Sequence, residues 1–292
     1  MMDRLQRTDV AAVKKVGIAA AYQAAEILLA KFGKLSRVRK KGAIDLVTEA
    51  DTASEECILR VIRSRFPDHG ILAEESGRDT GGSACTWIID PLDGTTNYAH
   101  QIGLYAVSIG FAVEGDVLVG IVLNPATGEL FTATAGAGAV CNERPIRVSQ
   151  IPLLADSLLA TGFPYDVRDD LAPIVSRFAR CLEAAQGIRR LGSAALDLCH
   201  VACGRFEGFW EEHLKPWDTA AGMLIAQEAG ARITDFSNRP YTPDSREILA
   251  TNGHIHEQML ELLAEKPCGE TDRRQETTRT QNSAATRRPI EK

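Results

Sequence analysis

Carboxylates that follow short apolar runs are the first feature of this sequence that could do chemistry. In the segment 87–97 (Trp-Ile-Ile-Asp-Pro-Leu-Asp-Gly-Thr-Thr-Asn), Asp90 and Asp93 come at the end of such a run and precede Gly94 and Thr95. We expect the run to form a strand that the intervening proline ends, so that both carboxylates reach one space as cation ligands. Backbone amides at the following turn or helix start could bind an anion. The alternative is an Asx-turn that only caps a helix.

Two further acidic groups could join this pair. Glu74 and Glu75 follow the apolar residues 71–73, and adjacent carboxylates at a strand end repel each other unless a cation compensates them. Asp218 stands where we expect a helix to begin. Each group also has a simpler interpretation, because Glu pairs are common on protein surfaces and Asp is an ordinary N-cap residue. By themselves these two motifs leave both interpretations open.

Together, and in this order, the motifs resemble the inositol monophosphatase family. The resemblance rests on Glu74-Glu-Ser76, on the segment 90–97 and on Trp217-Asp218 with the following Ala220-Ala-Gly222. It extends from about residue 10 to 265 and includes the segments 45–51 and 124–146. It implies an α/β fold, an αβαβα five-layer sandwich. The expected domains are an N-terminal α+β half at 1–150 with the metal site, an α/β half at 151–265 that completes it, and a disordered tail at 266–292.

The resemblance also implies a cofactor, Mg²⁺, with two to three ions. The matching metal ligands are Glu74, Asp90, Asp93, Asp218 and the backbone carbonyl of Leu92, with Asp90 bridging two ions. These are oxygen ligands, as Mg²⁺ requires. The bound ions would lower the pKa of the attacking water and neutralise charge on the phosphoryl and leaving oxygens.

Three residues match catalytic positions of the family. By the resemblance, Glu74 and Thr95 orient the attacking water and help to deprotonate it. Asp51 and Lys40, with Asp45, resemble the family's residues that surround this water and form a weaker third metal site.

The substrate contacts implied by the resemblance overlap with the metal ligands. They are Leu92, Asp93, Gly94, Thr95, Gly192, Ser193, Ala194, Glu211 and Asp218. The amides of Gly94 and Thr95 would hold the phosphate, and the loop 192–194 would line the alcohol side. Glu211 would bind a substrate hydroxyl, although Glu211-Glu212 could also be a solvated acidic pair. Ser193 is not expected to be a hydrolase nucleophile, because no Gly-x-Ser-x-Gly elbow surrounds it.

These residues predict a Mg²⁺-dependent, lithium-sensitive phosphomonoesterase that acts on a small polyol phosphate. The expected substrate is myo-inositol 1-phosphate, and the expected partner is a second copy of the chain in a homodimer. Fructose 1,6-bisphosphate, histidinol phosphate or a nucleotide phosphate are the alternatives that share the mechanism. A regulatory binding protein with incidental activity is the alternative from another class.

The elements that must position these residues follow from hydrophobic spacing and from Gly, Pro and Asn between the apolar runs. We expect helices at 10–33, 52–66, 172–185, 194–202, 219–229 (with Asp218 as N-cap) and 257–264. We expect strands at 71–73, 86–89, 106–113, 117–123, 130–133, 157–160, 231–234 and 248–250. Gly115-Asp116 reads as a hairpin turn between the third and fourth strands.

Composition limits the remaining possibilities. The 292 residues carry 39 acidic and 33 basic side chains, a net charge of −6, which argues against nucleic acid or an anionic membrane as the main partner. Residues 11–30 are Ala-rich but interrupted by polar side chains, so they predict neither a signal peptide nor a membrane span. After Pro267 the chain is polar, with a net charge of +3 over 266–292, and a basic interaction tail is the alternative to disorder there.

The cysteines favour a reducing compartment, the cytoplasm. There are seven, an odd number, with no Cys-x-x-Cys pair, which is not typical of a disulfide framework or a zinc cluster. Cys199 and Cys203 share a helix face with His200 between them and could suggest a metal. Core packing is the expected interpretation.

Overall fold

The computed structural model describes residues 9–35, 38–40, 46–168 and 171–264. The tail predicted at 266–292 and the predicted third-site residue Asp45 lie outside the described residues. The backbone of Lys40 is described, but its side chain is not.

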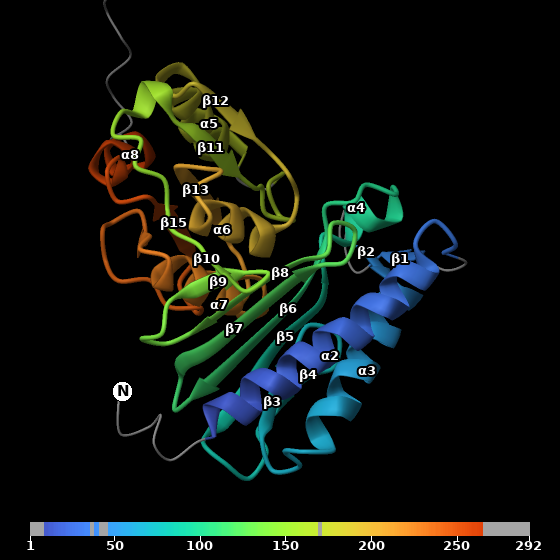
Figure 1. Ribbon diagram of the computed structural model, residues 1–292. Helices are drawn as coiled ribbons and strands as arrows, with labels where there is room; N and C mark the ends of the chain where they lie inside the picture. Colours follow the sequence, from blue (N-terminus) through green and yellow to red (C-terminus); the bar gives the residue numbers. More distant parts are fainter. Residues whose placement is uncertain (1–8, 36–37, 41–45, 169–170, 265–292) are drawn as a thin grey trace, which may run out of the picture.

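The chain folds into five layers of alternating helices and sheets (Figure 1). Helices α2 (Val10–Lys31) and α3 (Glu49–Arg63) cover the outer face of an eight-stranded sheet. Helices α6 (Ala194–Ala202) and α7 (Pro216–Glu228) separate that sheet from a five-stranded one, and α5 (Leu171–Ala184) and α8 (His256–Leu263) complete the stack. This arrangement confirms the expected αβαβα sandwich.

The larger sheet has the strand order β10-β9-β8-β7-β6-β5-β3-β4. Only β3 and β5 run parallel within it, which brings their carboxyl ends side by side. In chain order the strands are β3 (Gly70–Ala73), β4 (Gly77–Asp79), β5 (Cys85–Asp93), β6 (Ala106–Val113), β7 (Asp116–Asn124), β8 (Glu129–Thr134), β9 (Ala139–Cys141) and β10 (Arg144–Pro145).

The smaller sheet has the order β12-β11-β13-β15-β14, with β12, β11 and β13 parallel. Its strands are β11 (Leu158–Thr161), β12 (Gly187–Arg189), β13 (Gly208–Glu212), β14 (Arg232–Thr234) and β15 (Glu247–Thr251). A short pair, β1 (Val38–Lys40) and β2 (Leu46–Thr48), precedes α3, and two short helices, α4 (Thr95–Ala99) and η1 (Leu154–Asp156), lie in connections.

Close packing of α7 on the larger sheet depends on small residues. Strands β6 and β7 are buried along nearly their whole length, because helices cover both faces of the sheet. A Cβ placed on Gly120 would lie 2.5 Å from the carbonyl oxygen of Ala221, so α7 could not lie this close over any larger residue. This contact fixes the position of α7, and therefore of Asp218 in its first turn.

The expected strand ending at Pro91 is wrong in detail, because β5 continues to Asp93. Its register against β6 shifts between Asp90 and Asp93, which marks a bulge. Proline has no backbone N–H to donate. It is tolerated there because a bulge interrupts the ladder of hydrogen bonds between the two strands.

The expected hairpin turn is displaced by one residue. Strand β6 ends at Val113 and β7 begins at Asp116, so the turn residues are Glu114 and Gly115. Both have positive φ angles, 52° and 90°, as a tight turn of the primed type requires. Asp116, predicted as a turn residue, is the first residue of the strand.

Candidate active site

A cavity of about 410 Å³ lies where the carboxyl ends of β3, β5 and β13 approach the first turns of α6 and α7. Most of the predicted site residues line it: Glu74, Asp90, Leu92, Asp93, Gly94, Thr95, Gly192, Ser193, Ala194, Glu211 and Asp218. Asp51 does not line the cavity but is hydrogen-bonded to Thr95, which does. The structure therefore brings together residues that are up to 167 positions apart in the sequence.

The bulge at the end of β5 presents Asp90 and Asp93 to this cavity. Asp90 is 2% exposed, and its Oδ1 accepts a hydrogen bond of 2.9 Å from the amide of Leu92. The hydroxyl of Ser54 on α3 donates to the carbonyl of Pro91 at 2.8 Å. Helix α3 thus holds the bulge in place from behind, and the carboxylates lie on its other side.

Glu74 reaches the same cavity from the neighbouring parallel strand. Its amide donates to the carbonyl of Ile89 on β5 at 3.1 Å, directly past the end of β3. The turn that follows is fixed by Glu55, a 3% exposed residue of α3 whose two carboxylate oxygens accept from the amides of Glu75 and Ser76 at 2.9 and 2.8 Å. Of the adjacent residues Glu74 and Glu75, Glu74 is therefore the one that lines the cavity.

Asp218 enters from α7, although not as the predicted N-cap. The helix begins at Pro216, a favoured first residue, so Asp218 stands in the first turn. Its Oδ2 accepts from the amide of Lys215 at 2.7 Å, which fixes the side chain.

Asp93 is oriented by α6. Its Oδ2 accepts from the hydroxyl of Ser193 at 2.6 Å and from the amide of Ala195 at 2.8 Å. Ser193 is the N-cap of α6, and its hydroxyl is committed to this helix end and to Asp93. The structure gives Ser193 the role of a carboxylate-positioning residue and not the surroundings of a nucleophile.

Electrostatics in this cavity favour a bound cation. Burial, together with the charges of Glu74, Asp93 and Asp218, raises the pKa of Asp90 well above its usual range. Burial raises the pKa of Asp218 in the same way, and Asp93 and Glu74 add to it. Burial also raises the pKa of Asp93 to about 6. Carboxylates gathered out of water in this way repel each other unless positive charge is placed among them.

The donor set fits Mg²⁺ or a similar hard cation. The groups that face the cavity at this end are carboxylates and the backbone of Leu92, without a His or Cys ligand among them. Among the described residues, no three Asp, Glu, His or Cys side chains already surround one metal position. The fit therefore rests on the chemistry and the crowding of the donors, and not on a preassembled coordination shell.

Thr95 and Asp51 form a hydrogen-bonded pair behind the carboxylates. The hydroxyl of Thr95 lies 3.0 Å from Oδ1 of Asp51 and 3.0 Å from the carbonyl of Leu92. Asp51 is fully buried, and its Oδ2 accepts from both the amide and the hydroxyl of Thr48, at 2.8 and 2.6 Å. Thr48 also caps α3, which is why this helix begins three residues before the predicted start. Burial raises the pKa of Asp51, and these hydrogen bonds oppose that shift.

Gly94 and the loop 192–194 pack against each other beside α4. Gly94 has a φ of +94°, and a Cβ there would lie 2.9 Å from the carbonyl oxygen of Leu104 and 3.2 Å from that of Gly192. The side-chain amide of Asn97 donates to the carbonyls of Leu104 and Leu191, both at 2.7 Å. Both conformation and space therefore require glycine at position 94.

Glu211 also lines the cavity, near the end of β13. It is 8% exposed, so it is not the solvated surface acid of the alternative interpretation. Burial raises the pKa of Glu211 to about 8, Arg190 opposes this shift, and Asp218 and Asp93 add to it. Its carboxylate lies on the backbone of Gly162, where a Cβ would be 2.0 Å from Oε2.

Several residues of this site carried no motif in the sequence. Ser54 and Glu55 orient the strand-end carboxylates from α3, and Gly162 and Arg190 accompany Glu211. Ser54 and Glu55 follow Asp51 by three and four positions, which places them on one helix face, and this spacing could have found them. Gly162 had no comparable signal.

The Cys199–His200–Cys203 group lies elsewhere, at the end of α6. Cys199 is fully buried, and the His200 ring packs edge-on against Phe206 at 5.3 Å. The six cysteines in the described part of the chain form no disulfide. Within the same part, no helix is long and apolar enough to cross a membrane.

Sequence comparisons match the chain to one protein family. The model of the inositol monophosphatase family matches residues 9–267. The inositol-1-monophosphatase of Synechocystis sp. is 47% identical over 239 residues, which cover 81% of this chain and 83% of that protein. The Nus factor SuhB of Pseudomonas aeruginosa is 39% identical over 255 residues, with 85% and 94% coverage.

Solved structures show the same fold. The inositol monophosphatase of Anabaena (Nostoc) sp. superposes with a TM-score of 0.81 at 42% identity, covering 89% of this chain and 98% of the other. The extragenic suppressor protein suhB of Bartonella henselae superposes with a TM-score of 0.84 at 38% identity, covering 88% and 100%.

Proposed function

This chain belongs to the inositol monophosphatase family and is a phosphoric monoester hydrolase, and we propose that its substrate is a small polyol phosphate, myo-inositol 1-phosphate, hydrolysed with Mg²⁺. One observation carries the proposal. Glu74, Asp90, Asp93 and Asp218 line one cavity, the other three raise the pKa of Asp90, and Glu211 lines the same cavity. A site of this kind suits a phosphate ester. Metal ions would hold its phosphate group, and Glu211 would face the hydroxyl groups of its alcohol part.

Glu74, Asp90, Asp93, Asp218 and the carbonyl of Leu92 are the residues that would hold two to three Mg²⁺ ions. Such ions supply Lewis acidity for the phosphoryl group and lower the pKa of a bound water. Asp90 would contribute most to holding the ions, because it is buried and the charges of the other three carboxylates act on it. Ser193 and the amide of Ala195 keep the Asp93 carboxylate in its orientation.

The Thr95–Asp51 pair would accept a proton from the attacking water. The Thr95 hydroxyl borders the cavity and can pass a proton to Oδ1 of Asp51, 3.0 Å away. Glu74 lies at the same end of the cavity and would orient the water. When the water oxygen bonds to phosphorus, the ester P–O bond would break, and the ester oxygen would leave on the opposite side of the phosphoryl group and take up a proton from solvent to become the alcohol.

The rest of the lining would bind the substrate. The amides of Gly94 and Thr95 would hold phosphate oxygens, with Leu92, Asp93 and Asp218 beside them. The loop 192–194 would contact the alcohol, and Glu211 would bind one of its hydroxyls. Arg190 lines the same region and offsets part of the charge of Glu211.

A panel of phosphate esters tests the substrate. We expect myo-inositol 1-phosphate to have the highest kcat/KM when compared with fructose 1,6-bisphosphate, histidinol phosphate and a nucleotide phosphate. The nucleotide belongs in the panel because Phe163, Tyr165 and Trp217 also line the cavity and could stack on a base. A clearly higher kcat/KM for any other ester overturns the substrate assignment. Inhibition by lithium is expected in the same assay.

A binding role is the second candidate, because a relative with 39% identity carries the name Nus factor SuhB. Deletion of residues 267–292 separates the two roles. A phosphatase whose chemistry is complete within residues 9–264 should keep its turnover after this deletion. Strong loss of turnover, or a tight partner that is lost with the tail, would favour the binding role.

We further propose that the protein is a cytoplasmic homodimer. Within each copy, the N-terminal half 1–150 and the C-terminal half 151–265 would together complete one site. Exposed apolar side chains along α5 support self-association. The exposed fractions of Leu171, Val175 and Leu182 are 53%, 50% and 52%. Light scattering on the purified chain measures the mass directly. Replacing Val175 and Leu182 by Lys should produce monomers if α5 lies in the interface.

A further inference from the structure

His213 follows β13 at the edge of the cavity and has an unusual backbone conformation. Its φ is +61°, in the left-handed region that a residue with a side chain rarely adopts. It lines the cavity together with Glu211 and Glu212, which precede it in the chain. A side chain kept at such a position is expected to make contacts that offset the strain.

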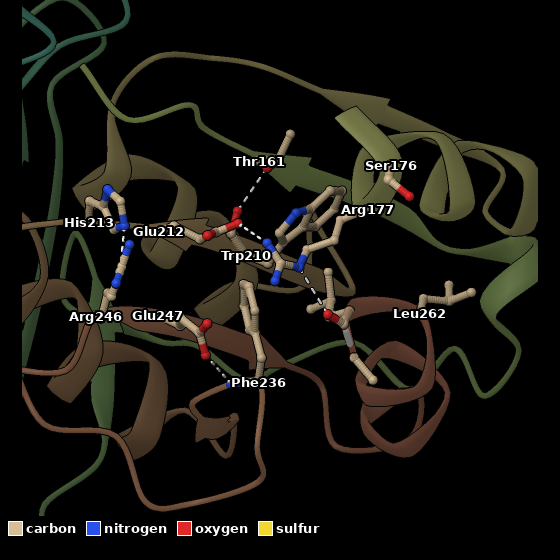
Figure 2. A network of polar contacts seen from close by, with 12 residues as sticks. Thr161, Ser176, Arg177, Trp210, Glu212, His213, Phe236, Arg246, Glu247 and Leu262 are labelled. Atoms are coloured by element: carbon tan, nitrogen blue, oxygen red, sulfur yellow. Dashed lines mark hydrogen bonds and ion pairs between the residues drawn. The ribbon is translucent and has the colours of Figure 1, made fainter. Parts of the chain in front are cut away.

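The imidazole of His213 is held on both sides. Its Nε2 lies 2.6 Å from Nε of Arg246 (Figure 2). Its Nδ1 lies 3.0 Å from both carboxylate oxygens of Asp166. The arginine Nε always carries hydrogen, so Nε2 accepts, and the ring proton on Nδ1 is donated to Asp166. The amide of His213 also donates to the carbonyl of Arg246 at 2.7 Å. We call this chain of three side chains the Asp166–His213–Arg246 latch.

The strand end that carries the latch is firmly held. Next to His213, the Glu212 carboxylate pairs with Nη1 of Arg177 at 2.8 Å, and both side chains are largely buried (Figure 2). The Nε of Arg177 donates to the carbonyl of Leu263, and its guanidinium lies over the Phe236 ring. His213 therefore projects from a rigid support.

The loop on the other side of the latch follows β11 and forms part of the cavity wall. Phe163, Pro164 and Tyr165 line the cavity, and Tyr165 is 60% exposed. Asp166 comes directly after this wall and connects it to His213, which is 47 positions away in the chain. The Glu211 carboxylate lies on Gly162, the residue directly before the wall. A displacement of the wall would therefore change the surroundings of Glu211.

We propose that the Asp166–His213–Arg246 latch positions the wall 163–165 beside Glu211 and so determines how tightly the alcohol part of the substrate is held. The proposal rests on the proposed phosphatase function. Asp166, His213 and Arg246 act on the substrate through the wall, so they are positioning residues and not catalytic ones.

Replacement of His213 by Gly tests the latch without adding strain, because Gly tolerates a φ of +61°. For His213→Gly we expect a rise of about five- to tenfold in KM for myo-inositol 1-phosphate, as for the loss of a charge-assisted hydrogen bond. We expect kcat to change less than about twofold, since the carboxylate end of the cavity is untouched. The KM for p-nitrophenyl phosphate, which has no hydroxylated ring, should change less. Asp166→Asn should act in the same direction and more weakly, because the amide oxygen still accepts from Nδ1.

Asn238→Gly is the matched control. Asn238 has a φ of +62° and accepts a hydrogen bond from Arg232, but it does not line the cavity. This variant also removes a side chain at positive φ together with a hydrogen bond to an arginine. Its KM values should equal those of the unmodified chain.

Amide hydrogen exchange of residues 163–168 in the absence of substrate gives a second readout. We expect faster exchange in His213→Gly and Asp166→Asn than in the control. Unchanged exchange in both variants, or faster exchange with no change in the relative KM of the two esters, overturns the proposal. If the unmodified chain hydrolyses none of the panel esters, the proposed function fails, whereas the exchange rates still decide whether the latch holds the wall.

Discussion

The hydroxyl of Thr95 lies 3.0 Å from Oδ1 of Asp51, and this contact joins the first turn of α3 to the start of α4 across 44 positions of sequence. Asp51 is fully buried, and its second oxygen is already committed to Thr48. The Thr95 hydroxyl therefore connects the cavity to a buried carboxylate, which is the arrangement needed to remove a proton from an attacking nucleophile.

Removal of this hydroxyl should reduce turnover. Thr95→Val keeps the shape of the side chain, and we expect kcat to fall by about 10²- to 10⁴-fold with little change in KM, because a positioned proton acceptor contributes about this much. Thr95→Ser keeps the hydroxyl and should remain within about tenfold of the unmodified chain. A Val variant with near-normal kcat would exclude the proton pathway. Circular dichroism checks that both variants fold.

Gly162→Ala should displace the Glu211 carboxylate. The added Cβ would lie 2.0 Å from Oε2, so the carboxylate or the backbone must move, and overpacking of this kind costs about 1–3 kcal/mol. We expect a higher KM for myo-inositol 1-phosphate and a lower free energy of unfolding, measured by urea denaturation. Gly82→Ala is the control, since a Cβ there would meet nothing within 4 Å. Identical KM values in both variants would show that Glu211 does not contact the substrate.

Asp93 and Ser193 should differ strongly in their kinetic importance. Asp93→Asn removes a proposed metal ligand and should lower kcat/KM by on the order of 10³-fold or more. Ser193→Ala removes one hydrogen bond to Asp93, so about a tenfold loss is expected. If the Ser193 variant lost as much activity as the Asp93 variant, Ser193 would have a direct chemical role. Stopped assays of phosphate release measure both.

His256 should make the free energy of unfolding depend on pH. It is fully buried between the hydroxyls of Thr234 and Thr251, at 3.0 and 2.8 Å, and burial, with the Arg232 charge, lowers its pKa to about 4. Because the unfolded chain takes up the proton near pH 6.5 and the folded chain does not, the contribution of His256 is complete above pH 6.5. It decreases as the pH falls toward 4, by up to about 3 kcal/mol in all.

Replacement of His256 by Gln isolates this contribution, because all other titrating groups are common to both proteins. Urea denaturation at pH 7 and pH 5 should show a larger loss of stability for His256→Gln at pH 7. Equal losses at the two pH values would mean that His256 titrates normally in the folded protein.

The family resemblance was sufficient to predict the layered fold, and local apolar runs indicated that these carboxylates gather in one place. Glu74 follows β3, Asp90 and Asp93 belong to the end of β5, and the parallel pairing of β3 and β5 places these ends together. The bulge at Pro91 was not predictable from the expectation that proline ends a strand, because the register shift depends on how β6 pairs on the other side.

Sequence motifs could not identify the residues that act through tertiary contacts. Glu55 supports Glu74 only because α3 packs behind β3 and β5, and Gly162 matters only because Glu211 lies on it. The latch joins Asp166, His213 and Arg246 from three separate segments, and none of them stands in a motif. The spacing of residues along the chain does not indicate such contacts.

Removal of the metal tests the central claim most directly. Phosphate release from myo-inositol 1-phosphate should fall by more than about 100-fold in excess chelator and return when Mg²⁺ is restored, because the clustered carboxylates then regain their counter-charge. Mg²⁺ should also raise the Tm of the unmodified chain more than that of Asp93→Asn, which keeps the fold but loses a ligand. Full turnover in excess chelator, with no effect of Mg²⁺ on Tm, would contradict a metal-dependent phosphatase at this site.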